Sequence, residues 1–285
     1  RGDPMNRTRW RNVGNELLSN KMGIAAVVVL LILTLGAIFA FLSPHDPNEL
    51  DVMRKLKPPG ADHWFGTDDY GRDYFARALY GGRVSLLVGF SAMILATALG
   101  TLVGVVSGYF GGWVDNLLMR LLEIIMSIPS FLVMLLLSVF LKPGVGNVVV
   151  IIGLLMWMNL ARIVRAETLA IKEREYVLYA KASGQGAFGI IGKHILPSLL
   201  PVVIVGATNN IASAILMESS LSFLGFGVQA PNATWGSMLN SAQGYIVNAP
   251  YLALFPGALI LLTVLSFNIL GDILRVGFEP KLGKR

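Results

Sequence analysis

An uncharged stretch of 27 residues, Val84–Phe110, restricts the fold of this chain more than any other feature. As an α-helix it would be about 40 Å long, whereas the apolar core of a bilayer is about 30 Å thick. A helix of this length can cross a bilayer with some tilt. The stretch therefore predicts a membrane-spanning helix.

Five further apolar runs extend this prediction to an all-α membrane protein with six transmembrane helices. The chain is 14% charged, where a soluble domain carries about 25% charge. Pro129 is expected to kink the third span, because proline interrupts the hydrogen bonds of a helix. The predicted spans are Met22–Leu42, Val84–Phe110, Ser130–Leu141 extended back to Trp113, Asn147–Ala161, Leu199–Leu221 and Tyr251–Leu274.

The distribution of lysine and arginine predicts that both termini lie in the cytoplasm, where basic residues concentrate. The segment before the first span, the 162–193 segment and the tail after the last span are all rich in Lys and Arg, whereas residues 222–250 contain none. The 43–83 connection is basic as well, but it is long and also carries seven acidic residues, so its weight in the rule is small. The basic residues lie between apolar runs, so topology explains them better than nucleic-acid binding.

The spans divide the chain into five predicted parts. These are a cytoplasmic tail at 1–21, a first transmembrane helix at 22–42, an extracytoplasmic loop with an amphipathic helix at 43–83, a core at 84–275 with a cytoplasmic loop at 162–198, and a cytoplasmic tail at 276–285. Residues 1–4 precede Met5 and are interpreted as a remnant of an expression tag.

The most informative part of the cytoplasmic loop is Glu175–Pro201, with the sequence EYVLYAKASGQGAFGIIGKHILPSLLP. A helix is predicted from about Ala161 through Lys181, ended by the glycines that follow at 184, 186 and 189. Pro197 marks the start of the next span. A short helix with a glycine-rich turn suits the docking of a soluble partner, and an ordinary connection between helices remains the alternative.

The same segment resembles the EAA loop of binding-protein-dependent ABC importers, in which Glu-Ala-Ala is followed by a spaced glycine and a closing Leu-Pro. Ala180, Gly184 and Leu196-Pro197 match the last Ala, the Gly and the closing pair. Leu178 and Tyr179 replace the leading Glu-Ala, and His194 stands in the position of an isoleucine. The missing carboxylate can be supplied by Glu175 from one turn earlier, which we state as a hypothesis.

Other motifs extend the resemblance over roughly residues 20–282. They occur in the order found in the C-type permeases of dipeptide, oligopeptide and nickel importers. The matching segments are Gly66–Asp73 (GTDDYGRD), Gly108–Asp115 (GYFGGWVD), Ser222–Gly227 (SFLGFG), Thr234–Gly236 (TWG) and Asn268–Asp272 (NILGD).

The resemblance implies a five-helix MetI-like permease core preceded by one extra N-terminal helix, in a bacterial or archaeal cytoplasmic membrane. It also implies a coupling helix that seats in a groove of an ATPase. The coupling residues would be Glu175, Tyr176, Tyr179, Ala180, Ser183, Gly184, Leu196 and Pro197. The implied partners are a sister B-type permease, two ATPase subunits and an extracytoplasmic substrate-binding protein. Peptide is the favoured cargo, and nickel or a metal chelate is the alternative.

The chain itself shows no nucleotide-binding motif. Gly186–Lys193 superficially resembles a phosphate-binding loop, but five residues separate its glycines instead of four. His194 also replaces the Ser or Thr that holds Mg²⁺ in such loops. We therefore expect no cofactor on this chain and no enzyme activity, with ATP and Mg²⁺ bound by partner ATPases.

The 43–83 loop gathers His63, Asp68, Asp69 and Asp73, which suit either a metal ion or turns and a helix cap. We favour turns at Gly66 and Gly71, with Asp68 or Asp69 capping a helix at Tyr70–Leu79, and assign no metal ligands. His45, next to Pro44, is expected to be solvated.

Few charged residues fall near the predicted spans. A charged residue in a membrane is costly, so each of these is a candidate functional residue. Glu218, near the outer end of the fifth span, is a candidate for the substrate pathway or, equally, a cap for the 219–227 turn. Arg120 and Glu123 are spaced to pair on one face of the third span. The sparse charges at the centres of most spans disfavour the main rival, an ion-coupled secondary transporter, which usually carries ionisable residues at the membrane midplane.

Overall fold

The computed structural model describes residues 4–278, and within that range the chain is helical without named strands. The predicted tag remnant and the 276–285 tail therefore lie largely outside the described residues. In chain order the helices are α1 Pro4–Ser19, α2 Lys21–Ile38, η1 Ala40–Leu42, η2 Val52–Arg54, α3 Tyr74–Phe110, α4 Gly112–Met126, α5 Ser130–Phe140, α6 Val145–Lys172, α7 Glu175–Ala182, α8 Ala187–Ile190, the π-helix η3 Ile191–Ile195, α9 Leu196–Phe223, α10 Trp235–Ala242, η4 Gln243–Tyr245 and α11 Tyr251–Phe278.

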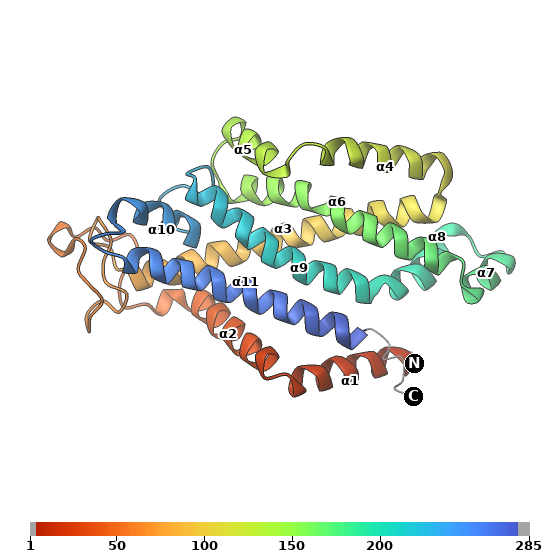
Figure 1. Cartoon of the computed structure of the whole chain (residues 1–285), viewed down its shortest axis with the longest axis horizontal. Coiled ribbons are helices and arrows are strands. Elements are labelled where there is room, and N and C mark those ends of the chain that lie inside the picture. The colour runs from red at the N-terminus through yellow and green to blue at the C-terminus, as the bar shows by residue number, and fades with distance from the viewer. Residues whose placement is uncertain (1–3, 279–285) are drawn as a thin grey trace.

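The long helices run back and forth along the long axis of the molecule (Figure 1) and give up to six passes across a bilayer. Five helical stretches are long and apolar enough to cross a bilayer: α2, α3, α6, the continuous stretch Ala187–Phe223 and α11. The sixth pass is the pair formed by α4 and α5, which meets the same test when its members are taken together. The predicted all-α membrane fold, with one N-terminal span before five others, is confirmed.

The third pass is bent more sharply than the single kink that was expected. The axes of α4 and α5 differ by 79° across the break that contains Pro129. Proline cannot donate a backbone hydrogen bond, and it disfavours helical dihedrals in the residue before it. The predicted interruption at Pro129 is therefore confirmed, but it produces two separate helices.

The second pass begins ten residues earlier than predicted. The separate helix expected at Tyr70–Leu79 is wrong, because the residues from Tyr74 onward form the first turns of the 37-residue α3. Asp73, and neither Asp68 nor Asp69, caps this helix by accepting a hydrogen bond from the Ala76 amide at 2.7 Å.

Two arginines inside α3, the exposed Arg83 and the buried Arg77, explain why the apolar pattern placed this boundary too late. The guanidinium of Arg77 in α3 donates to the Pro47 carbonyl oxygen at 3.1 Å and lies 3.6 Å from a carboxylate oxygen of Asp68. A charge that is satisfied in this way is tolerated inside a helix that also continues into the apolar region.

Small residues allow α3 and α6 to pack closely along their length. A side chain at Gly104 would place its Cβ 2.6 Å from the Ala161 carbonyl oxygen, and the equivalent positions Gly100 and Gly108 are almost as close to α6. Glycines four residues apart let helix backbones approach in a bilayer, where dispersion contacts replace the hydrophobic effect. This α3–α6 contact is the central packing contact of the helix bundle.

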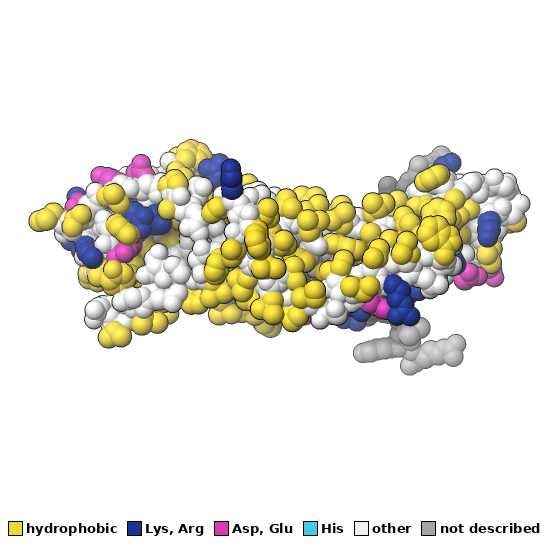
Figure 2. Space-filling model, turned by 90° about the horizontal axis from the view of Figure 1, so that it is seen from above, with side chains coloured by type: hydrophobic (Ala, Val, Ile, Leu, Met, Phe, Trp, Pro, Cys, Tyr) yellow, Lys and Arg dark blue, Asp and Glu magenta, His cyan; other side chains and the backbone are white. Residues whose placement is uncertain are grey.

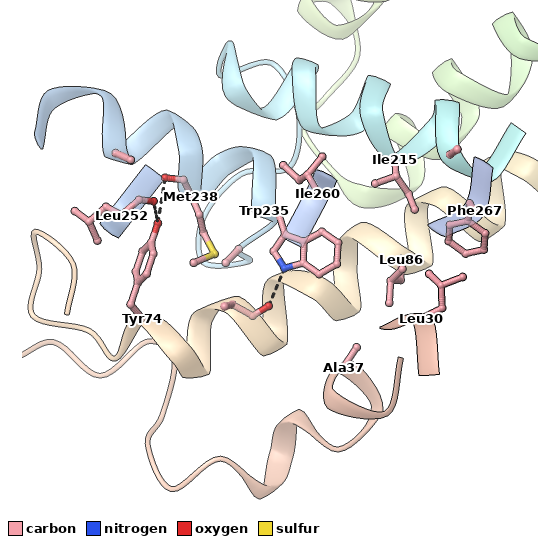
Figure 3. Packing of buried hydrophobic residues seen from close by; sticks show 14 of the residues in the cluster. Leu30, Ala37, Tyr74, Leu86, Ile215, Trp235, Met238, Leu252, Ile260 and Phe267 are labelled. Carbon is pink, nitrogen blue, oxygen red and sulfur yellow. Dashed lines mark hydrogen bonds between the residues drawn. The ribbon is translucent and has the colours of Figure 1, made fainter. Parts of the chain in front are cut away.

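A second core lies where α10 packs against α3, α9 and α11 (Figure 3). The indole N–H of Trp235 donates to the Ala78 carbonyl oxygen at 2.9 Å, and Gly82 leaves room for the ring. The hydroxyl of Tyr74 donates to the Leu252 carbonyl oxygen at 2.6 Å. Buried Trp and Tyr thus keep their polar atoms satisfied while their rings fill the core.

The two ends of the molecule have different contents. One end, which we call the loop end, carries residues 43–73 and α10 (Figure 1). The other, which we call the α7 end, carries α7 and α8, the start of α1 and the end of α11. Hydrophobic side chains cover the middle of the face seen in Figure 2, and charged side chains gather toward both ends. An apolar belt of this breadth matches a lipid environment.

Candidate functional site

The candidate site is the segment between α6 and α9 at the α7 end. The helix predicted from Ala161 through Lys181 is broken at residues 173–174. Glu173 ends α6, and Arg174 adopts an extended conformation, with φ −73° and ψ 144°, before α7 starts at Glu175. Neither residue is a glycine or a proline, so the sequence carried no breaker signal. The break makes α7 a separate short helix that projects beyond the bundle (Figure 1).

Gly184 ends α7 in a Schellman motif, as its place in the sequence predicted. Its φ is +80°, a conformation that residues with a Cβ rarely adopt. The Gly184 amide donates to the Lys181 carbonyl oxygen at 3.1 Å, and the Gln185 amide donates to the Ala180 carbonyl oxygen at 3.1 Å. Glycine is therefore required at this position by the backbone conformation and not by close packing within this chain.

Of the other two glycines, Gly186 lies in the predicted break, whereas Gly189 does not interrupt a helix. Gly186 precedes α8 with an ordinary φ of −70°, and Gly189 lies inside α8. From Ala187 the chain continues through η3 into α9 as one 37-residue helical stretch. Pro197 lies in the first turn of α9, as predicted, but the continuous helical stretch that contains this span starts ten residues before it.

The short helix α7 is held by one face. Val177 and Ala180 are buried in a cluster with Ile171 at the end of α6 and with Ile190 and Ile195. The opposite face presents Tyr179, which is 77% exposed, and in α8 Phe188 is 88% exposed. Large apolar side chains on a projecting surface are costly in water, so their exposure marks a surface for a partner.

The predicted coupling residues therefore divide into two groups. Ala180 is buried and anchors α7 to the bundle. The others are exposed at the surface of the α7 end: Glu175, Tyr176, Tyr179, Ser183, Gly184, Leu196 and Pro197. The sequence pattern thus found the exposed surface of the helix, together with one of its anchors.

Polar bonds that the sequence did not predict fix α7 against the start of α9. The hydroxyls of Tyr176 and Ser198 lie 3.1 Å apart, and Ser198 donates to the His194 carbonyl oxygen at 2.7 Å. A ring nitrogen of His194, Nε2, is 3.0 Å from the amide oxygen of Gln185. Movement of α7 would therefore be transmitted to the first turns of α9.

A cavity of about 870 Å³ opens beside this connection, between α6, α9 and α11. Its lining is apolar on the bundle side and charged toward the α7 end. The charged lining residues are Glu167, Arg174, Lys193, Asp272 and Arg275. This arrangement offers polar groups near the end of the bundle and an apolar wall deeper inside.

The segment Gly108–Asp115, where α3 ends and α4 begins, takes part in polar contacts that link α3, α4 and α6. Arg165 of α6 donates to a carboxylate oxygen of Asp115 in α4 at 2.6 Å, and Ser107 of α3 also donates to this carboxylate. The ammonium of Lys172 donates to the Gly108 carbonyl oxygen at 3.3 Å. The predicted pair of Arg120 and Glu123 is confirmed at 3.1 Å, on the exposed surface of α4.

Glu218, the candidate for the substrate pathway, is fully buried. One carboxylate oxygen accepts from the Ser222 hydroxyl at 2.7 Å, and the other accepts from the Ser85 hydroxyl at 3.1 Å. Ser222 in turn accepts from the Val228 amide, and Ser85 from the Trp235 amide. This geometry supports the alternative interpretation, in which Glu218 holds the turn that follows α9.

The acidic residues of the 43–73 loop serve mainly in turns. The Asp68 carboxylate accepts from the Tyr70 and Arg72 amides and from the Arg72 guanidinium at 2.6 Å. Burial, together with the neighbouring Asp68 carboxylate, raises the pKa of Asp69 above its usual range. The turns predicted at Gly66 and Gly71 are confirmed, since both residues have φ of +75°.

Comparison with known proteins covers both parts of the fold. Residues 100–284 match the family described as binding-protein-dependent transport system inner membrane component. Residues 8–59 match the family described as N-terminal TM domain of oligopeptide transport permease C.

Similar proteins cover almost the whole chain. A dipeptide transport system permease protein of Bacillus subtilis (strain 168) is 42% identical over 96% of this chain and 85% of its own length. An oligopeptide transport system permease protein of the same organism is 37% identical over 96% of this chain and 90% of its own length. A probable D,D-dipeptide transport system permease protein of Escherichia coli (strain K12) is 39% identical over 91% and 87%.

Proposed function

The chain belongs to the family of binding-protein-dependent transport inner membrane components, and from this premise we propose that it couples a partner ATPase to the import of peptides. It is a multi-pass permease subunit of the inner membrane. In the proposed assembly it works beside a sister permease, two ATPase subunits and an external binding protein. The α7 end faces the cytoplasm, in agreement with the basic residues of the 162–193 segment.

The observation that carries this proposal is the one-sided anchoring of α7. Val177 and Ala180 fix one face to the bundle, whereas Tyr179 leaves the other face open at the end of the molecule. A groove on an ATPase subunit can bury the exposed face, with Phe188 beside it. Closure of two ATPases around ATP would then move α7 as a unit.

Movement of α7 has a direct route into the membrane. The Tyr176–Ser198 contact and the His194–Gln185 contact join the α7–α8 segment to the start of α9. ATP binding favours the conformer in which the closed ATPases fit α7 best, and this difference in affinity shifts the equilibrium between inward-open and outward-open states. The cavity beside α9 and α11 would lie on the cytoplasmic part of the pathway.

Peptide is the proposed cargo because the similar proteins are named as dipeptide and oligopeptide permeases. Nickel or a metal chelate is the alternative that the sequence motifs leave open. The cargo is selected mainly by the external binding protein, so this chain supplies the route and the coupling.

Transport by the complete complex in proteoliposomes tests this proposal. We expect uptake of dipeptide that requires ATP and the binding protein and that persists when an ionophore collapses ion gradients. Uptake without ATP that an ionophore abolishes would instead identify an ion-coupled transporter. ATP-driven uptake of nickel, with none of peptide, would replace the cargo and keep the coupling role.

A further inference from the structure

Three potential metal ligands that are far apart in the sequence meet at the loop end. His45 follows the first membrane span, His63 lies in the middle of the loop, and Asp73 caps α3. Each offers one ligand atom, and these three atoms lie within 4.8 Å of one another. The sequence grouped His63 with Asp73 but not with His45, which lies 18 positions before His63.

Hydrogen bonds orient both imidazole rings. His63 Nδ1 lies 2.7 Å from Asp73 Oδ2, and His45 Nε2 lies 3.2 Å from the Asp62 carbonyl oxygen. If these nitrogens donate, His63 Nε2 and His45 Nδ1 keep their lone pairs for a ligand. A carboxylate or carbonyl oxygen behind a ligating histidine is the usual support of a metal-binding imidazole.

The two rings also lie close enough to share one ion. Their centroids are 5.0 Å apart, and their planes are inclined by 40°. Nitrogen ligands lie about 2.0–2.1 Å from a zinc ion, so two nitrogens on one ion are about 3.3 Å apart. A rotation of the partly buried His45 side chain toward His63 would bring its free nitrogen into this range.

The surroundings are accessible and carry balanced charge. The site opens into a cavity of about 670 Å³ whose lining includes Arg54, Lys57 and Asp62. Arg54 is paired with Asp51 at 2.9 Å, so Lys57 is offset by the carboxylates of Asp62 and Asp73. His63 is only 7% exposed, which protects one ligand while the cavity admits the ion.

We propose that His45 and His63 bind a divalent transition-metal cation, with Asp73 orienting His63 and contributing negative charge. Imidazole nitrogen favours zinc, nickel or copper over magnesium or calcium, which prefer oxygen ligands. Water completes the coordination from the cavity. The ion ties the segment that follows the first span to the N-terminus of α3, and so fastens the N-terminal span to the rest of the bundle.

This site is independent of the coupling proposed for α7, which lies at the opposite end of the molecule. If the chain binds zinc but fails to couple an ATPase, the proposed metal site still stands. Transport by a chain that binds no zinc would likewise leave the coupling proposal intact.

Zinc titration of the purified full-length chain without a histidine tag tests the site. The chain contains three histidines, so His45→Gln and His63→Gln can be compared with the matched control His194→Gln. We expect one zinc ion per chain in equilibrium dialysis, affinity lowered at least tenfold by either loop substitution, and no change for the control. Asp73→Asn keeps the capping oxygen and should weaken binding by about tenfold, the usual effect of losing a supporting carboxylate.

His45→Gln decides the outcome if His63→Gln does not fold, because His45 is only partly buried. Zinc, but not magnesium, should raise the thermal unfolding temperature of the wild-type chain and of His194→Gln, and should leave that of His45→Gln unchanged. Equal zinc binding by the wild type and His45→Gln, or a loss confined to His194→Gln, would overturn the proposal.

Discussion

The loop end and the α7 end of this molecule are built in opposite ways. At the loop end, side chains bond to backbone atoms very distant in the sequence: Tyr251 donates to the Lys57 and Thr67 carbonyl oxygens, and Trp235 to that of Ala78. At the α7 end, a short helix rests on Val177 and Ala180 and leaves Tyr179 and nearby side chains exposed. Long-range contacts within this chain hold the loop end together, whereas the short helix α7 depends on one anchored face and presents its other face for a partner.

The largest test of this contrast is truncation of an aromatic side chain at each end. Trp235→Ala should lower the free energy of unfolding by about 3–5 kcal/mol, because it leaves a cavity and the Ala78 carbonyl oxygen without its donor. Tyr179→Ala should change it by less than about 0.5 kcal/mol, since the ring is exposed. Unfolding in detergent, followed by tryptophan fluorescence or circular dichroism, measures both. Equal losses would remove the contrast.

A buried carboxylate provides the next test. Glu218→Leu leaves the Ser85 and Ser222 hydroxyls without their acceptor and should cost about 1–3 kcal/mol. Glu175→Leu makes the same chemical change on the exposed face of α7 and should cost less than about 0.5 kcal/mol. If Glu218→Leu were as stable as the wild type but unable to transport, Glu218 would belong to the pathway after all.

A substitution at the end of α7 should change stability less and coupling more. Gly184→Val should cost about 1–2 kcal/mol, because valine is strained at φ of +80°. Gly186→Val is the matched control, because Gly186 has φ of −70° and open space around it. We expect Gly184→Val to insert normally but to separate ATP hydrolysis from uptake, with Gly186→Val much closer to wild type. Normal coupled transport by Gly184→Val would argue against the role of α7.

The smallest structural change should still affect transport. Tyr179→Ala removes exposed surface alone, so the complex should lose uptake or ATPase stimulation severalfold while the isolated chain keeps its unfolding temperature. Full uptake by this variant would place the partner surface elsewhere.

The sequence predicted the features that depend on local composition, and it missed those that depend on tertiary contacts. Apolar length and basic residues predicted the six passes, since lipid imposes a minimum length on each span. They placed the start of α3 too late, because the uncharged run begins only after Arg83 and because the burial of Arg77 depends on Pro47 and Asp68, which only the fold brings near. Proline marked the break between α4 and α5 but could not give its 79° angle.

The site shows the same division. Gly184 was predictable because a positive φ selects glycine. The break at residues 173–174 carries no such residue, and Tyr176, Gln185, His194 and Ser198 meet only after the chain turns back on itself. The grouping of His45 with His63 also depends on tertiary contact, so a search by spacing missed it.

Cross-linking of single cysteines tests the central claim most directly, because the chain contains no cysteine of its own. Tyr179→Cys places a thiol on the α7 end, and Met53→Cys, at a side chain that is 90% exposed, places one on the loop end. In the assembled complex, the cysteine at 179 should cross-link to an ATPase subunit, and the cysteine at 53 should not. In intact cells, a membrane-impermeant maleimide should label only the cysteine at 53. Labelling of the cysteine at 179 from outside, or its failure to reach an ATPase, would contradict the account.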